Sequence, residues 1–103
     1  MAKKLPPVHP GEVLREEFME PLAISINALA RDLHVPVSRI SKIVNEERGI
    51  SAETALRLAR YFRMSSEFWM NLQSRYDLRV AQQQGSEMVK REVRPRELAR
   101  LTP

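Results

Sequence analysis

The sequence contains no cysteine, and its 103 residues include only three glycines and two histidines. Without thiols the chain can form no disulfide framework, no thiolate zinc site and no cysteine nucleophile. No apolar run approaches the roughly 18 residues needed to cross a bilayer, and the basic start of the chain lacks the apolar stretch of a secretory signal. We therefore expect a cytoplasmic protein that does not engage a membrane.

Catalytic signatures are also missing. Neither His9 nor His34 has a second metal-ligating side chain at a useful spacing, and no zinc-protease, phosphate-loop or dinucleotide-binding motif occurs. Serine, histidine and aspartate are present, but nothing in the sequence places them together. We expect no enzyme, no cofactor and no bound metal.

The composition fits one small domain. Hydrophobic residues make up 43% of the chain, which is enough for a single modest core. Lysine and arginine number 17 against 13 acidic residues, for a net charge of +4. This excess of positive charge permits a polyanionic partner without proving one.

Apolar residues recur with helical spacing in five segments, and nothing alternates with the period of a strand, so the sequence predicts an all-α fold. We expect helices over about 10–19, 25–33, 36–45, 51–62 and 65–80. Serines at the starts of three of these segments are good helix caps. Gly49 and Gly85 lie between periodic segments, where helix-ending glycines are expected.

The predicted organisation is an N-terminal arm over 1–8, a helical domain over 9–84 and a tail over 85–103. Residues 86–103 hold five basic and three acidic side chains and few apolar ones. The tail is interpreted as a short helix or a loosely held segment.

Two short helices joined by a tight turn, 25–33 and 36–45, predict a helix-turn-helix. Ala30 supplies the small residue needed where the helices cross, and Leu29, Leu33, Ile40 and Ile43 can hold the second helix on the first. The other face of the second helix is polar and short-chained, with cations interspersed. Such a face can enter the major groove of DNA.

Three features weigh against this interpretation. Pairs of amphipathic helices occur in many small bundles, where exposed cations are simply solvated. His34 stands where glycine is usual, so its backbone must be left-handed. Glu46 and Glu47 follow the second helix and would repel phosphates unless they turn away.

The motifs resemble those of a known family. The motifs are Ser25-x-x-x-Leu29-Ala30-x-x-Leu33-x-Val35, Ser38-Arg39-Ile40-Ser41-x-Ile43-Val44-Asn45 and Arg48-Gly49-Ile50-Ser51. They resemble the phage-repressor (XRE, Cro/C1) helix-turn-helix. Three flanking motifs resemble its HigA/VapI-type antitoxins: His9-Pro10-Gly11-Glu12-Val13-Leu14, the run 51–59, and Phe68-Trp69-Met70-Asn71-Leu72-Gln73-x-x-Tyr76-Asp77-Leu78. The resemblance covers about residues 8–80, and the tail matches poorly.

This resemblance implies a five-helix lambda-repressor-like bundle with a short C-terminal extension. It also implies a homodimer that binds a palindromic operator in double-stranded DNA, represses its own toxin–antitoxin operon and neutralises a RelE-like mRNA endonuclease toxin. Two alternatives remain: a stand-alone repressor of the same family without a toxin, and an interaction adaptor that has lost DNA binding. The toxin could bind residues 1–24, which include the acidic cluster Glu12, Glu16, Glu17 and Glu20, or residues 81–103.

The resemblance also assigns site residues. Base-contacting positions fall on Pro36, Val37, Ser38, Arg39 and Lys42. Phosphate-contacting positions fall on Ser25, Asn27, Ser41, Asn45 and Arg48. We expect Lys42 and Arg39 to be exposed, and Lys42 to make the strongest contact with DNA. The dimer interface is predicted at Trp69, Gln73 and Tyr76, with a core role as the alternative for each of them.

Overall fold

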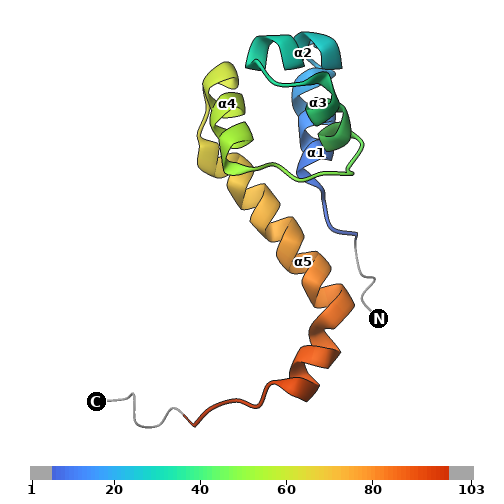
Figure 1. Cartoon of the computed structure of the whole chain (residues 1–103), viewed down its shortest axis with the longest axis vertical. Coiled ribbons are helices and arrows are strands. Elements are labelled where there is room, and N and C mark those ends of the chain that lie inside the picture. Colours follow the sequence, from blue (N-terminus) through green and yellow to red (C-terminus); the bar gives the residue numbers. More distant parts are fainter. Residues whose placement is uncertain (1–5, 98–103) are drawn as a thin grey trace, which may run out of the picture.

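The structure, a computed structural model, describes residues 6–97, which form helices and no strand (Figure 1). The elements are α1 (Pro10–Val13) with a π-helical continuation (Leu14–Met19), α2 (Ile26–Leu33), α3 (Val37–Val44), α4 (Ala52–Phe62) and α5 (Ser66–Glu92). The predicted all-α, five-helix fold is confirmed. Parts of the predicted arm and tail, residues 1–5 and 98–103, lie outside the described residues.

The helix starts follow the expected chemistry. Pro10 occupies the first helical position, and the Nδ1 atom of His9 accepts a hydrogen bond of 2.9 Å from the Gly11 amide. Serine side chains cap three other helices, each accepting from a backbone amide of the first turn. These caps are Ser25 for α2, Ser51 for α4 and Ser65 for α5.

The helix ends are unusual because no glycine adopts the left-handed conformation. Ala23, His34, Glu46 and Arg63 have positive φ angles of 55–63°, whereas the glycines do not. At each end the next amide reaches five residues back, as the Val35 amide does to the Ala30 carbonyl at 3.0 Å. The left-handed backbone expected at His34 is therefore confirmed.

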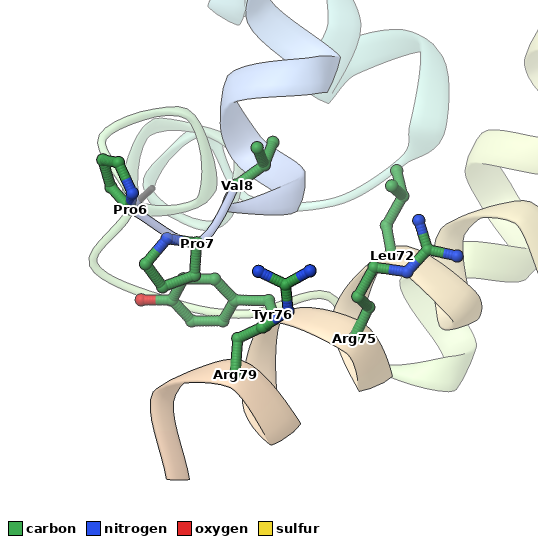
Figure 2. Close-up of a pocket in the computed structure, with 7 residues that line it drawn as sticks. All are labelled: Pro6, Pro7, Val8, Leu72, Arg75, Tyr76 and Arg79. Carbon is green, nitrogen blue, oxygen red and sulfur yellow. The ribbon is translucent and has the colours of Figure 1, made fainter. Parts of the chain in front are cut away.

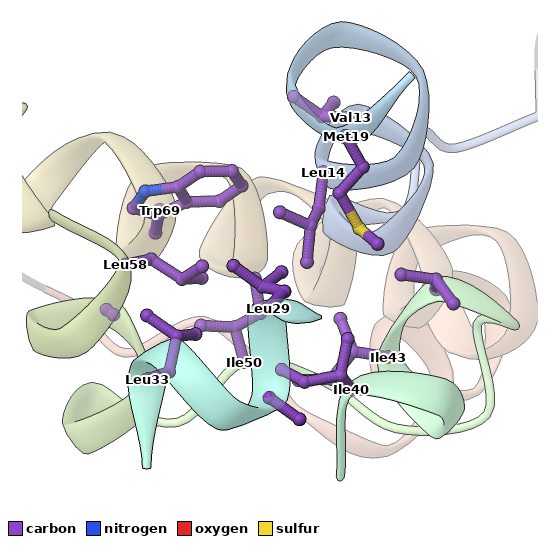
Figure 3. Packing of buried hydrophobic residues seen from close by; sticks show 13 residues of the cluster. Val13, Leu14, Met19, Leu29, Leu33, Ile40, Ile43, Ile50, Leu58 and Trp69 are labelled. Atoms are coloured by element: carbon purple, nitrogen blue, oxygen red, sulfur yellow. The ribbon is translucent and has the colours of Figure 1, made fainter. Parts of the chain in front are cut away.

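The core forms where α5 begins to pack on the first four helices (Figure 3). Its fully buried large side chains come from every helix. They are Leu14, Leu29, Ile40, Ile43, Leu58 and Trp69. Leu56 of α4 is 62% exposed, so not every apolar residue of this helix contributes to the core.

Helix α5 is longer than predicted. It runs through Gly85 to Glu92, so Gly85 does not end a helix. A Cβ atom at Gly85 would meet nothing, and good helix formers on both sides outweigh the cost of one glycine, about 1 kcal/mol. Trp69 alone among its described residues is buried, and the second half of the helix projects from the bundle (Figure 1).

Candidate nucleic-acid interface

The turn between α2 and α3 places the second helix firmly on the first. The chain leaves α2 through the left-handed His34 and enters α3 at Pro36, whose carbonyl accepts from the Arg39 amide at 3.0 Å. Ala30 is fully buried at the crossing, and Ile40 and Ile43 are fully buried beneath α3. The inward face of α3 is thus fixed, and its outward face is defined.

Two arginines outside the helix-turn-helix donate hydrogen bonds to the C-terminal ends of α2 and α3. The Nη1 atom of Arg57 in α4 donates to the Leu33 carbonyl of α2 at 2.8 Å. The Nη1 atom of Arg15 donates to the Val44 carbonyl of α3. A cation at a helix C-terminus satisfies free carbonyls and complements the helix dipole. Neither role was predictable from local sequence patterns, because each contact joins residues more than 20 positions apart.

Most of the predicted DNA-contacting side chains are exposed. On α3, Val37 is 46% exposed, and Ser38, Lys42 and the preceding Pro36 are also exposed. The predicted phosphate-contacting residues Ser25, Asn27, Asn45 and Arg48 are exposed as well. Residues 38, 42 and 45 lie on one face of the helix, because they are three and four positions apart. This outward face of α3 therefore carries one cation, Lys42, between side chains that are shorter and uncharged.

Arg39 and Ser41 depart from that pattern. Arg39 was expected to be exposed, but its side chain is only 23% exposed and its Nη1 atom lies 3.1 Å from the Glu53 carboxylate. The start of α4 brings Glu53 beside α3, which no local pattern could indicate. Ser41 is half-buried, and its hydroxyl accepts from Asn45 at 3.4 Å.

The acidic residues after α3 are partly directed away from its outward face. Glu46 has a left-handed backbone, and its carboxylate lies 3.8 Å from Arg15, on the first helix. Glu47 is exposed, and no ion pair joins it to another residue in the described part of the chain. The repulsion expected from Glu46 is therefore reduced, whereas that of Glu47 is not.

The three predicted interface residues of α5 have different surroundings. Trp69 is fully buried in the chain's own core, so its predicted interface role is wrong and the core alternative holds. The Gln73 side chain accepts from the Ile50 amide at 2.6 Å and donates to Asp77 at 3.0 Å. Tyr76 packs edge-on against the His9 ring, with centroids 4.7 Å apart. The interface roles of Gln73 and Tyr76 remain predictions.

Tyr76 also lines a cavity of about 330 Å³ between the N-terminal segment and α5 (Figure 2). The other lining residues are Pro6, Pro7, Val8, Leu72, Arg75 and Arg79.

Within residues 6–97, no three histidine or carboxylate side chains gather as metal ligands would. No described helix is both long and apolar enough to cross a membrane.

Comparison with known proteins identifies the family. The profile of the helix-turn-helix family matches residues 16–69. Virulence-associated protein I of Dichelobacter nodosus is 54% identical over 80 residues, which cover 78% of this chain and 74% of that protein. Antitoxin HigA-1 of Vibrio cholerae serotype O1 is 38% identical over 72 residues, covering 70% of this chain and 68% of that protein.

A solved structure agrees with these relatives. The structure of Pseudomonas aeruginosa antitoxin HigA with the higBA promoter superimposes with a TM-score of 0.84 and 49% identity, covering 86% of this chain and 97% of that one. The sequence motifs, the order of the helices and the overall structure of this chain therefore all agree with those relatives. The chain belongs to the helix-turn-helix family and, within its phage-repressor (XRE, Cro/C1) type, to the HigA/VapI-type antitoxins.

Proposed function

We propose that this protein is a DNA-binding antitoxin that represses its own operon and neutralises a RelE-like mRNA endonuclease toxin. The observation that carries the DNA-binding part is the geometry of α3. Its inward side is anchored by buried Ile40 and Ile43, while Val37, Ser38 and Lys42 point outward and are exposed. The structure of Pseudomonas aeruginosa antitoxin HigA with the higBA promoter, a protein of the same fold, supports DNA binding by this chain.

The exposed residues suit different parts of a duplex. Val37 can contact a thymine methyl group but cannot donate a hydrogen bond, and Ser38 is short enough to approach a base edge. Lys42 can donate to guanine or to a phosphate. Shorter polar side chains and one cation suit the phosphate backbone, where contacts position the protein without reading sequence. These are Ser25, Asn27, Ser41, Asn45 and Arg48.

A homodimer completes the proposal. One chain can place only one α3 in one groove, so a palindromic operator requires two copies with half-sites about 34 Å apart. Helix α5 is proposed to join the copies, with Gln73 and Tyr76 near the base of the contact. Exposed Leu78, Met88 and Val89 farther along α5 support this role, because a projecting helix leaves them uncovered in one copy.

The DNA-binding part is tested by titrating the DNA upstream of the protein's own gene with wild type and Lys42→Ala. We expect Lys42→Ala to weaken binding and to lower the salt slope by about 1, because one cation no longer displaces counterions. Arg60→Ala is the control, since Arg60 is an exposed cation on α4, outside both the predicted DNA contacts and the proposed dimer contact. Equal affinity of wild type and Lys42→Ala, or binding that ignores salt, would contradict the proposal.

The toxin-neutralising part needs its own measurement. The product of the neighbouring gene is purified, and its cleavage of mRNA is measured with and without this protein. Inhibition at a fixed stoichiometry is the expected result. Intact operator binding without any inhibition would instead favour the stand-alone repressor.

A further inference from the structure

One carboxylate links three helices around the proposed DNA-binding surface. The Glu53 side chain lies in the first turn of α4, with Oε1 3.1 Å from Arg39 of α3 and Oε2 3.3 Å from Arg57 of α4. Arg57 in turn donates to the carbonyl of Leu33, the last residue of α2. Glu53 therefore holds two cations, and within residues 6–97 only Arg57 has a second hydrogen-bond acceptor.

Arg39 is drawn back from solvent by this contact. Its side chain is 23% exposed, although it follows the exposed Ser38 on the outward half of α3. Its Nε atom is buried and has no hydrogen-bond acceptor among the described residues, so packing confines the head group as well. The guanidinium is thus held against the first turn of α4.

The Glu53 carboxylate is charged at neutral pH, where DNA binding would be measured. Hydrogen bonds from Arg57 and Arg39 hold the pKa of Glu53 below its usual value. An ionised carboxylate and a guanidinium match in geometry, which favours a fixed position of the arginine over a mobile one. A mobile arginine beside α3 could instead bind a phosphate of any sequence.

We infer that Glu53 limits the affinity of this protein for DNA of arbitrary sequence by keeping Arg39 out of contact with phosphates. Arg39 therefore stabilises the junction of α3 and α4 and adds no phosphate contact. Its ion pair with Glu53 also withholds it from the base contact expected from the family resemblance. This inference rests on the proposed function. Low affinity for arbitrary DNA matters because such DNA greatly outnumbers operator sites and competes for the protein.

The test is a double-mutant cycle at Glu53 and Arg39, read out on a duplex without an operator. We expect Glu53→Gln to raise affinity roughly fivefold in about 0.1 M salt and to steepen the salt slope by about 1, since one more phosphate is contacted. In the Arg39→Gln background the same change at Glu53 should have neither effect. Arg57 should stay in place in all four proteins, because Leu33 still accepts its hydrogen bond.

Two controls separate this mechanism from general effects. Glu47→Gln removes one negative charge near the end of α3 without releasing an arginine, so it should not steepen the salt slope as Glu53→Gln does. Thermal unfolding of every variant shows whether the fold is retained. Glu53 is 59% exposed, so the loss of its charge should cost little stability.

Three results would overturn the inference. The first is an unchanged or lower affinity of Glu53→Gln for the non-operator duplex, and the second is an equal effect of that change with and without Arg39. The third needs only Arg39→Gln: a salt slope reduced by about 1 would show that Arg39 already binds phosphate in the wild type. Failure of the proposed function has a separate signature, because the wild type would then not prefer its own upstream DNA over the non-operator duplex.

Discussion

Gly11 lies where α1 meets the end of α3, and among the three glycines it alone lies this close to the backbone of another helix. A Cβ atom at this position would lie 1.7 Å from the carbonyl oxygen of Ile43. Because the clash is with backbone and not with a flexible side chain, the two helices would have to separate. We expect Gly11→Ala to lower the free energy of unfolding by roughly 1–3 kcal/mol, toward the upper end, measured by urea denaturation.

Gly85→Ala is the matched control for Gly11→Ala. Gly85 lies inside α5 with open space around it, so alanine should raise helix stability by about 0.5–1 kcal/mol. Stability of Gly11→Ala close to that of the wild type would mean that α1 does not pack on α3 through this residue.

The buried His9 ring predicts an acid-sensitive stability. Burial lowers the pKa of His9 below its ordinary value and outweighs the attraction of the Glu46 and Asp77 carboxylates. The unfolded chain therefore takes up a proton before the folded chain does. We expect the free energy of unfolding to be constant above about pH 7 and to fall as the pH drops below about 6.5, by at most about 1.4 kcal/mol per pH unit.

Denaturation between pH 5.5 and 8 measures this dependence without titrating most carboxylates. His9→Asn keeps a side-chain acceptor at the helix cap but cannot titrate, so its stability should vary less with pH. His34→Asn serves as the control, because His34 is exposed and asparagine tolerates the left-handed backbone. A pH dependence that His9→Asn leaves intact would assign the effect to another group.

Residue-scale roles were predictable where they depend on near neighbours in the chain. The caps at Ser25 and Ser51 and the left-handed His34 follow from local sequence, and the structure confirms them. The close approach at Gly11 was not foreseen, because it requires knowing that α3 lies opposite α1. The ion pair of Arg39 with Glu53 was missed for the same reason.

At the scale of elements, the left-handed helix ends leave room for stabilisation. Arg63 ends α4 with a φ of 57°, a conformation that costs a residue with a Cβ atom about 1–2 kcal/mol. Glycine avoids this cost but gains freedom in the unfolded chain. We expect Arg63→Gly to raise the free energy of unfolding by about 0.5–1 kcal/mol in urea denaturation.

The control for Arg63→Gly is Arg60→Gly, one turn earlier and inside α4. That change should lower the free energy of unfolding by about 1 kcal/mol, because glycine is a poor helix former. Two changes of the same chemistry thus should act in opposite directions. A destabilised Arg63→Gly would show that the arginine side chain makes a contact that matters more than its backbone.

Elements with strong apolar periodicity were predicted well, and the exception is α5. The first four predicted helices agree with the structure to within about two residues, a scatter typical of helix ends. From the sequence we expected α5 to end before Gly85, because glycine commonly follows the last residue of a helix. In the projecting part of α5, few side chains are buried, so periodicity carries little information and intrinsic helix propensity decides. The division of the chain at residue 84 stays a proposal.

At the scale of the whole molecule, the described chain is elongated. Its radius of gyration is 18.0 Å, with extents of 54 × 37 × 23 Å, whereas a compact chain of about 100 residues has a radius near 13 Å. The projecting half of α5 accounts for the difference (Figure 1). The surface that would face DNA was predictable from one helix-turn-helix pattern, but the proposed two-copy assembly depends on this projection, which the sequence did not reveal.

The dimer proposal predicts a strict dependence on operator geometry. If α5 joins two copies rigidly, both α3 helices can enter major grooves only when the half-sites lie on the same side of the duplex, about 34 Å apart. Inserting five base pairs between the half-sites turns one of them about half a turn away. We expect affinity in a binding titration to fall by about 100-fold or more, toward that for arbitrary DNA.

Two further duplexes make this result interpretable. Changing five central base pairs without changing the length should have a much smaller effect, since the geometry is kept and only DNA stiffness differs. Inserting ten base pairs returns both half-sites to the same side of the duplex but doubles the distance between them, so a rigid dimer should still bind poorly. Full affinity for the five-base-pair insertion would mean that each copy binds its half-site alone, and α5 would then have no part in pairing the two recognition helices.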